Sequence, residues 1–149
     1  MSSRIKLYTD TPTSGDTDGT LVSSGTDASP VDSGAITVPA ASFENGSWVK
    51  LALRCDAGYE TRLDSGIHAK VTLVDGAHLD KWQLAPDDSG SPDTLNATDW
   101  DVPETELDFT VQIDDTNTIF WARARVEHTE DAANDTSVTF RVEAVIGVA

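Results

Sequence analysis

The feature that most constrains this chain is an alternation of apolar and polar residues that recurs along its length, with turn-forming residues between the segments. The clearest examples are "LDFTVQI" at residues 107–113 and "IFWARARVEH" at residues 119–128. Successive side chains of a β-strand point to opposite faces, so this pattern predicts strands with one buried face. No segment shows a sustained helical period, and we therefore expect no helix.

The expected strands are short and number eight or nine. Besides the two segments above, the candidates are residues 4–9, 21–23, 35–40, 48–55, 68–74, 81–85 and 137–148. Short polar turns join only antiparallel neighbours, which predicts a meander of residues 107–113, 119–128 and 137–148. The predicted fold is all-β: a single antiparallel β-sandwich over residues 1–149, immunoglobulin-like or jelly-roll. Its expected irregular parts are a loop-rich region at residues 10–34 and a long loop at residues 86–106.

Charge and hydropathy limit the partners. The chain holds 26 acidic and 10 basic residues, a net charge of −16, which argues against binding to nucleic acid. No apolar run has the length of a membrane span, and the start, "MSSRIKLYTDTP", lacks the features of a signal peptide. We therefore expect synthesis in the cytoplasm and no membrane contact. Dispersed aspartate with few lysines is the pattern of a surface adapted to high salt, and an ordinary acidic bacterial or viral protein is the equally open alternative.

Residues that commonly carry enzyme chemistry occur without a recognisable arrangement. His68, His78 and His128 have no metal-binding spacing, and the single cysteine, Cys55, falls on the apolar face of a predicted strand. Hydrolase, nucleotide-binding and zinc-protease motifs are absent from the sequence. We therefore expect a protein that is not an enzyme.

Two aspartate-rich loops are the candidates for a bound ion, since calcium takes several oxygen ligands from flexible loops. The first is "GDTDGT" at residues 15–20 and the second is "DDSGSPD" at residues 87–93. Neither matches the twelve-residue loop of a helix-loop-helix calcium site. A structural calcium ion is the only cofactor we consider, and its candidate ligands are Asp16, Asp18, Asp87, Asp88 and Asp93.

The outward side of residues 119–128 is the candidate binding surface. In the predicted hairpin it gathers three of the six arginines beside a tryptophan. One interpretation is that these arginines cover the aromatic ring and pair with Glu127 and Glu143. The other is an interface that receives the acidic surface of another subunit, because Trp and Arg are common contact anchors. The candidate interface residues are Trp121, Arg123, Arg125 and Arg141.

Three stretches of the chain carry a resemblance to a known group of proteins. They are "KLYTDTPTSGDTDGTLVSSGTDASPV", "VKLALRCDAGYET" and "TIFWARARVEHTEDAANDTSVTFRVEAV". They resemble small β-sandwich structural proteins of tailed bacteriophages and their archaeal relatives. The last stretch is similar to the closing hairpin of many virion-associated sandwich domains.

The resemblance implies a non-enzymatic virion component, on the capsid surface or in the tail or baseplate. Its partners would be other capsid or tail proteins and further copies of itself. The loops at residues 11–34 and 86–106 are candidate contact arms. The resemblance implies no particular binding residues.

A carbohydrate-binding module is the main alternative, because β-sandwiches commonly present aromatic platforms to sugars. An enzyme on a sandwich fold is a third reading. The candidate sugar-binding aromatics are Trp48, Tyr59, Trp82 and Trp100.

Overall fold

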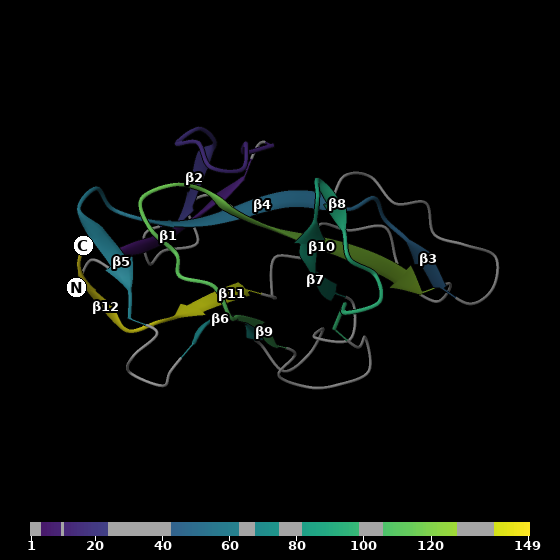
Figure 1. Ribbon diagram of the computed structural model, residues 1–149. Helices are drawn as coiled ribbons and strands as arrows, with labels where there is room; N and C mark the ends of the chain where they lie inside the picture. Colours follow the sequence, from purple (N-terminus) through teal and green to yellow (C-terminus); the bar gives the residue numbers. More distant parts are fainter. Residues whose placement is uncertain are drawn as a thin grey trace.

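The structure, a computed structural model, describes the chain in seven segments that contain strands and turns but no helix (Figure 1). The prediction of an all-β antiparallel fold is therefore confirmed. Twelve strands occur in the described residues rather than eight or nine, because several are only two or three residues long and carry too little alternation to be recognised. The described residues are 4–9, 11–23, 43–62, 68–74, 82–98, 106–127 and 139–149.

The larger sheet is built around β10 (Thr118–Glu127), a strand of ten residues. β3 (Phe43–Asn45) and β4 (Val49–Cys55) both pair with one side of β10, and the amide of Gly46 donates to the carbonyl of Ala124 where β3 ends. β7 (Trp82–Asp88) pairs with the other side of β10. The described strands of this sheet are β2 (Thr20–Ser23), β1 (Ile5–Thr9), β4 (Val49–Cys55), β10 (Thr118–Glu127), β7 (Trp82–Asp88) and β8 (Ser91–Pro92), in that order, with β3 (Phe43–Asn45) beside the far end of β10.

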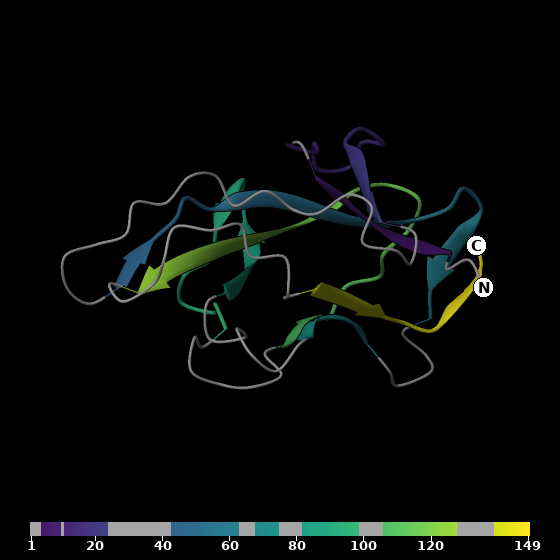
Figure 2. The same ribbon diagram turned by 180° about the vertical axis from the view of Figure 1, so that it is seen from behind.

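A smaller sheet lies beneath the larger one and completes a two-layered, sandwich-like arrangement (Figures 1 and 2). A two-stranded ribbon sits at the end of the molecule where both chain termini lie. The smaller sheet consists of β11 (Thr139–Glu143), β6 (Ala69–Val74) and β9 (Glu106–Phe109), and the ribbon of β12 (Ile146–Val148) and β5 (Tyr59–Thr61).

The hydrophobic core lies between the two layers and follows the alternation of the long strands. Leu51, Leu53 and Cys55 of β4 are buried, as the alternation predicts. The rings of Phe109 and Phe120 meet edge to face, with their centroids 5.7 Å apart and an interplanar angle of 82°. Because β9 and β10 belong to different sheets, this aromatic contact joins the layers.

The predicted meander at the end of the chain is wrong. β9 pairs with β6, β10 with β4, β7 and β3, and β11 with β6. β9 ends at Phe109, and Val111, expected to point inward, is 56% exposed. Ile113 is fully buried. Its backbone is satisfied there by Thr61, since its amide donates to Oγ1 of Thr61 (2.9 Å) and its carbonyl accepts from the amide of Thr61 (2.8 Å). Residues 110–117 therefore connect the two layers instead of forming a tight hairpin.

The loop predicted at residues 86–106 is partly strand. β7 continues through Pro86 to Asp88, and Ser89 and Gly90, with φ angles of 51° and 95°, turn the chain into β8. Thr98 then bonds back to β7, since its Oγ1 accepts from the amide of Leu84 (2.9 Å). Residues 99–105 with Trp100, residues 24–34 of the loop-rich region and the predicted strand at residues 35–40 lie outside the described residues.

Candidate interaction face of the larger sheet

Strand register places one set of side chains on the side of the larger sheet that faces away from the smaller sheet, here called the outer face. Trp121 stands opposite Lys50 of β4 and Ala85 of β7, and Arg123 stands opposite Gln83. Directly opposed residues of neighbouring strands point to the same side. The described residues at outer-face positions include Lys6, Tyr8, Trp48, Lys50, Ala52, Arg54, Gln83, Ala85, Asp87, Ile119, Trp121, Arg123 and Arg125.

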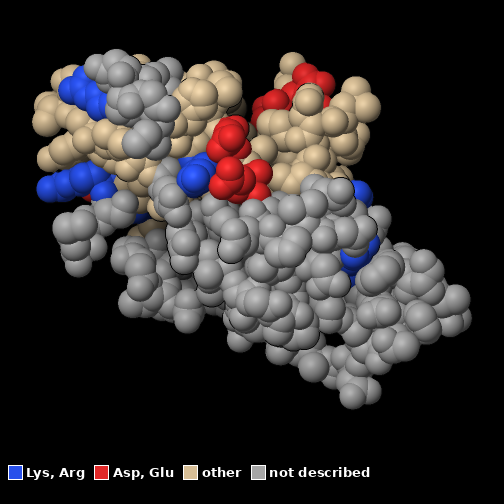
Figure 3. All heavy atoms as spheres, turned by 90° about the horizontal axis from the view of Figure 1, so that it is seen from below, with Lys and Arg blue, Asp and Glu red and all other residues tan. Residues whose placement is uncertain are grey.

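The outer face concentrates positive charge in an acidic protein. Five of the ten basic residues lie there, although the chain as a whole carries a net charge of −16. Seen from the side of the smaller sheet, the basic side chains of the described residues lie in scattered small groups, one of them directly beside acidic side chains (Figure 3). The five basic residues of the outer face are Lys6, Lys50, Arg54, Arg123 and Arg125.

Arg123 is held in place by two neighbours. Its guanidinium carbon lies 4.4 Å from the centroid of the Trp48 ring, and its Nε donates to Oε1 of Gln83 at 2.8 Å. Partial burial lowers the pKa of Arg123 from its ordinary value, but a guanidinium remains charged at any pH of interest. The face therefore presents a fixed, stacked cation.

Trp121 occupies the middle of the outer face. Its Nε1 donates to Oδ1 of Asp87 at 2.8 Å, and Nζ of Lys50 lies 6.0 Å from the ring centroid. Ala52 and Ala85 are fully buried although they are on the same side of the sheet. Small residues at these positions let the larger side chains around them close over the strands.

At the other end of the outer face, hydrogen bonds join the loop at residues 13–18 to the turn that ends at Asn117. The buried carboxamide of Asn117 donates to the carbonyl oxygens of Thr13 (3.0 Å) and Asp18 (3.2 Å) and to Oδ1 of Asp18 (2.9 Å). Arg54 donates through Nη1 to the side-chain oxygen of Asn117 (2.9 Å) and to the carbonyl of Asp18 (2.7 Å), and it stacks 3.7 Å from the ring centroid of Tyr8. We call Asn117, Arg54, Asp18 and Thr13 the loop clasp.

The structure does not place Arg141 beside Trp121. It lies on β11 of the smaller sheet, opposite Thr72 of β6, while Trp121, Arg123 and Arg125 lie on β10. The predicted adjacency is wrong because it assumed that strands consecutive in sequence pair with each other. The predicted pairing of the arginines with Glu127 and Glu143 involves side chains outside the described part of the structure.

At the first calcium candidate, oxygen atoms that would bind a cation are already bonded to donors of the chain. The Asp18 carboxylate accepts from the amide and Oγ1 of Thr13, each at 2.7 Å, and these bonds lower its pKa. Oδ1 of Asp16 accepts from the amide of Thr17 at 2.8 Å. Arg54 and Asn117 both donate to the carbonyl oxygen of Asp18. These oxygens of the loop are therefore already hydrogen-bonded to donors of the chain.

The second calcium candidate is a pair of turns. Asp87 accepts from Trp121 and from the amide of Gly90, and Asp93 accepts from the amide of Leu95 and the carboxamide of Asn96. In the described residues, no three Asp, Glu, His or Cys side chains form a group that could hold a metal ion. The structure thus gives no support to calcium binding at Asp16, Asp18, Asp87, Asp88 and Asp93.

The three described aromatic residues considered for carbohydrate binding do not form an open platform. Arg123 covers a face of Trp48, and Arg4 lies 4.7 Å from the ring centroid of Tyr59. Trp82 is half-buried and packs against the core, and Trp100 lies outside the described residues. A ring face covered by a guanidinium is not available for stacking on a sugar.

Cys55 is a buried structural residue, as its place in the alternation predicts. Its thiol lies 3.5 Å from the carbonyl oxygen of Ile113, and burial, with a contribution from Asp114 and other acidic neighbours, raises its pKa to about 11. Of the three histidines, His68 is exposed, while His78 and His128 lie outside the described residues.

We expect Cys55 to react with a chromogenic disulfide reagent at least ~100-fold more slowly in the native protein than in denaturant at about pH 8, because only the thiolate attacks. The measurement is the absorbance of the released thiol over time. Equal rates in native and unfolded protein would show that the thiol is not sheltered by the core.

Comparison of the chain with models of protein families, with curated proteins and with solved structures found no match. The described residues include no helix of the length and apolarity needed to cross a membrane. The function is therefore argued from the outer face itself.

Proposed function

We propose that this protein is a non-enzymatic structural protein that works by protein–protein contact, with the outer face of the larger sheet as its contact surface. The observation that carries the proposal is the gathering of half of the chain's basic residues with Trp48 and Trp121 on one sheet face. Trp and Arg are the residue types most often found as energetic anchors of protein interfaces.

The contacts within the face suit such a role. Trp48 and Gln83 fix Arg123, and Asp87 fixes the indole of Trp121, so little side-chain freedom would be lost on binding. All three of Trp48, Trp121 and Arg123 are half-buried, which leaves part of each side chain at the surface. A preordered, positively charged surface favours an acidic protein as the partner.

The larger assembly that we propose is the particle of a tailed virus. The support is the resemblance of the opening and middle stretches to virion β-sandwich proteins, together with the all-β fold. The similarity to a closing hairpin no longer contributes, because β10 and β11 belong to different sheets. The protein would sit on the capsid surface or in the tail or baseplate, and its aspartate-rich, lysine-poor composition favours a host that lives in high salt.

The contact face is tested by reversing its charge. Arg123→Glu with Arg125→Glu is expected to reduce incorporation into particles at least tenfold, because two anchoring cations become anions facing an acidic partner. The measurement is the amount of protein retained on purified particles of the source virus after the variant is supplied in place of the native chain. Arg123→Gln with Arg125→Gln keeps polar side chains of similar size in case the reversal disturbs the sheet.

The matched control is Lys70→Glu on β6 of the smaller sheet, which removes one ion pair with Glu106 but leaves the outer face unchanged. It should be incorporated like the native chain. Normal incorporation of both arginine variants would refute the role of the face. Absence of the native protein from particles, probed by immunogold labelling, would refute the virion assignment separately.

A further inference from the structure

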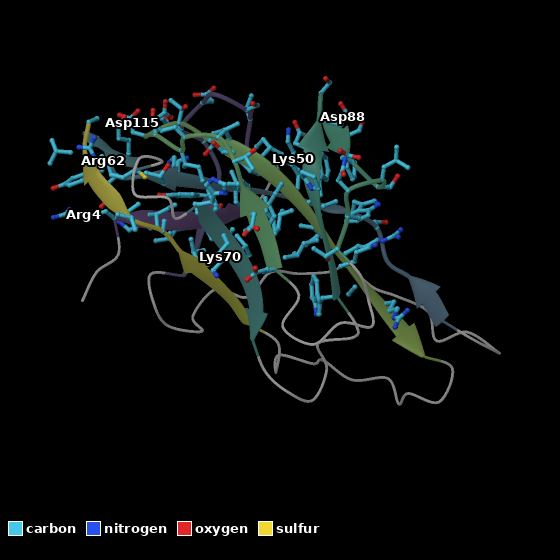
Figure 4. All side chains as sticks on the ribbon, turned by 60° about the horizontal axis from the view of Figure 1, so that its bottom comes forward. Arg4, Lys50, Arg62, Lys70, Asp88 and Asp115 are labelled. Carbon is cyan, nitrogen blue, oxygen red and sulfur yellow. The ribbon has the colours of Figure 1, made fainter. Side chains whose placement is uncertain are left out.

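Along β10, acidic residues lie at one end of the outer face and basic residues at the other. Asp114 and Asp115 lie in the turn before the strand, two residues short of its start, and the clasped loop with Asp16 lies beside this turn, since the amide of Asn117 donates to the carbonyl of Asp16 at 2.8 Å. Arg54, bonded within the loop clasp, is the basic outer-face residue beside them. The carboxylates of these three aspartates are exposed. We call this region the acidic end; Figure 4 shows Asp115 toward one end of the molecule, with Lys50 nearer the middle.

The basic end lies further along the same strand. It consists of Lys50, Trp48, Trp121, Arg123 and Arg125, and the carboxylate of Asp87, held by Trp121, lies among them. At about 3.4 Å per residue, Arg123 and Arg125 lie roughly 17 and 24 Å from the start of β10, while Lys50, opposite Trp121, lies nearer, at roughly 10 Å. The two arginines are thus about two to three screening lengths of ~8 Å from the start of the strand at physiological ionic strength. The acidic end therefore does little to neutralise these two arginines within one molecule.

A surface with two ends of opposite charge is complementary to itself. When two such faces stack about a two-fold axis between the ends, the acidic end of each copy meets the basic end of the other, and the contact is made twice. A partner for the basic end must be acidic, and this chain, with a net charge of −16, meets that requirement. Salt at physiological strength screens repulsion between charges far from the contact more than attraction within it.

We propose that two copies of this chain pack the outer faces of their larger sheets against each other about a two-fold axis. In this dimer, Asp16, Asp114 and Asp115 of one copy face Lys50, Arg123 and Arg125 of the other. The inference rests on the proposed function in taking the outer face as a contact surface, and it adds that the partner is a second copy.

A charge exchange between two variants tests this pairing. The basic-end variant is Lys50→Glu with Arg125→Glu, and the acidic-end variant is Asp16→Lys with Asp115→Lys. Each alone should dimerise at least tenfold more weakly than the native chain, because like charges meet at both contacts. An equimolar mixture should recover dimers, since the reversed basic end then meets the reversed acidic end while the native ends meet each other. The measurement is sedimentation equilibrium at about 0.15 M and at about 1 M ionic strength, because the proposed host lives in high salt. At 1 M the screening length falls to ~3 Å, and only charges in direct contact still attract each other.

Controls on the smaller sheet separate charge placement from net charge. Lys70→Glu and Asp108→Lys make single charge reversals of each sign away from the outer face and should dimerise like the native chain. Recovery in the mixture would also show that both variants are folded. A native chain that stays monomeric, or variants that dimerise normally, would overturn the inference.

Failure of this inference can be told apart from failure of the proposed function. A monomeric native chain whose incorporation into particles still depends on Arg123 and Arg125 would leave the contact face intact and identify a different acidic protein as its partner. If neither dimerisation nor incorporation into particles depends on these residues, the outer face is not a contact surface and the proposed function fails as well. An association that fails to recover in the mixture of variants would also overturn the two-fold pairing of the ends.

Discussion

Replacing Phe120 with alanine is expected to lower the free energy of unfolding by about 3–5 kcal/mol, the range for removing a buried aromatic side chain. Phe120 is fully buried, and its ring contacts Phe109 edge to face across the two layers. The substitution removes apolar burial and leaves a cavity at the point where the sheets meet. For a domain whose total stability is of order 5–15 kcal/mol, this is a large share. Urea denaturation followed by tryptophan fluorescence measures it.

The matched control is Val111→Ala, because Val111 lies in the connection between the layers but is 56% exposed. Its effect should stay within about 0.5 kcal/mol. The Phe120 variant should shift the midpoint of a single transition without changing the slope much. Two separate transitions would contradict a shared core, because they would mean that the larger and the smaller sheet unfold independently. An effect no larger than that of Val111→Ala would contradict the burial of Phe120.

The alternation of apolar residues was sufficient to predict the main strands. In β4 and β10, Leu51, Leu53, Phe120 and Ala122 are expected inside and are buried, while Val49, also expected inside, is partly buried. The same pattern placed Trp121, Arg123 and Arg125 together on the outside of one strand, where the structure has them. The face of a strand on which a residue lies depends only on its position in the alternation, so a period of two in the sequence predicts it directly.

Strand pairing was not predictable in the same way. The turn residues after Ile113 and the stretch before Thr139 suggested hairpins, and Arg141 was placed beside Arg123 on that basis. The structure instead brings Gln83 of β7 and Trp48, the residue before β4, to Arg123, and Lys50 of β4 to Trp121. Which strands become neighbours depends on how the layers pack, and no local signal in the sequence carries that information.

Burial on the outer face was also missed. Ala52, Ala85 and Ile119 occupy positions that alternation assigns to solvent, yet each is at most 5% exposed. Ala52 stands between Tyr8 and Ile119 in register, and Ala85 stands opposite Trp121. Their burial is decided by large cross-strand neighbours, and such neighbours can be named only once the register is known.

The loop clasp is the clearest case of a site without a sequence signal. The sequence singles out Asp18 only as a candidate calcium ligand and gives Asn117 no role. In the structure the amide of Asn117 and the guanidinium of Arg54 occupy acceptors of the loop at residues 13–18. The contacts of Asn117 with this loop join residues 99 and 104 positions apart, and that of Arg54 joins residues 36 positions apart, so only the folded chain brings a donor to each acceptor.

We expect Asn117→Asp to lower the free energy of unfolding by about 3 kcal/mol near pH 7. The substitution keeps the shape of the side chain but replaces its donor group with a carboxylate oxygen. That oxygen would face the carboxylate of Asp18 and the carbonyl oxygen of Thr13, which now accept from the amide. The measurement is the urea midpoint of the variant and of the native chain as a function of pH.

The pH dependence separates this explanation from a general loss of packing. In the native chain, hydrogen bonds from Thr13 lower the pKa of Asp18, so this group stabilises the fold above its unfolded pKa and the contribution is lost as the pH falls. In the variant, burial and the carboxylate of Asp18 raise the pKa of the introduced carboxyl, and the guanidinium of Arg54 at its other oxygen offsets part of this rise. Protonation restores a donor, so the deficit should shrink as the pH is lowered toward about 5. The control Asn96→Asp also places a new carboxyl beside an aspartate, because the carboxamide of Asn96 donates to Asp93, but on an exposed turn. Asn96→Asp should lower the free energy of unfolding by less than about 0.5 kcal/mol. If the loss of stability in Asn117→Asp does not change with pH, the clasp does not act through the donors of Asn117.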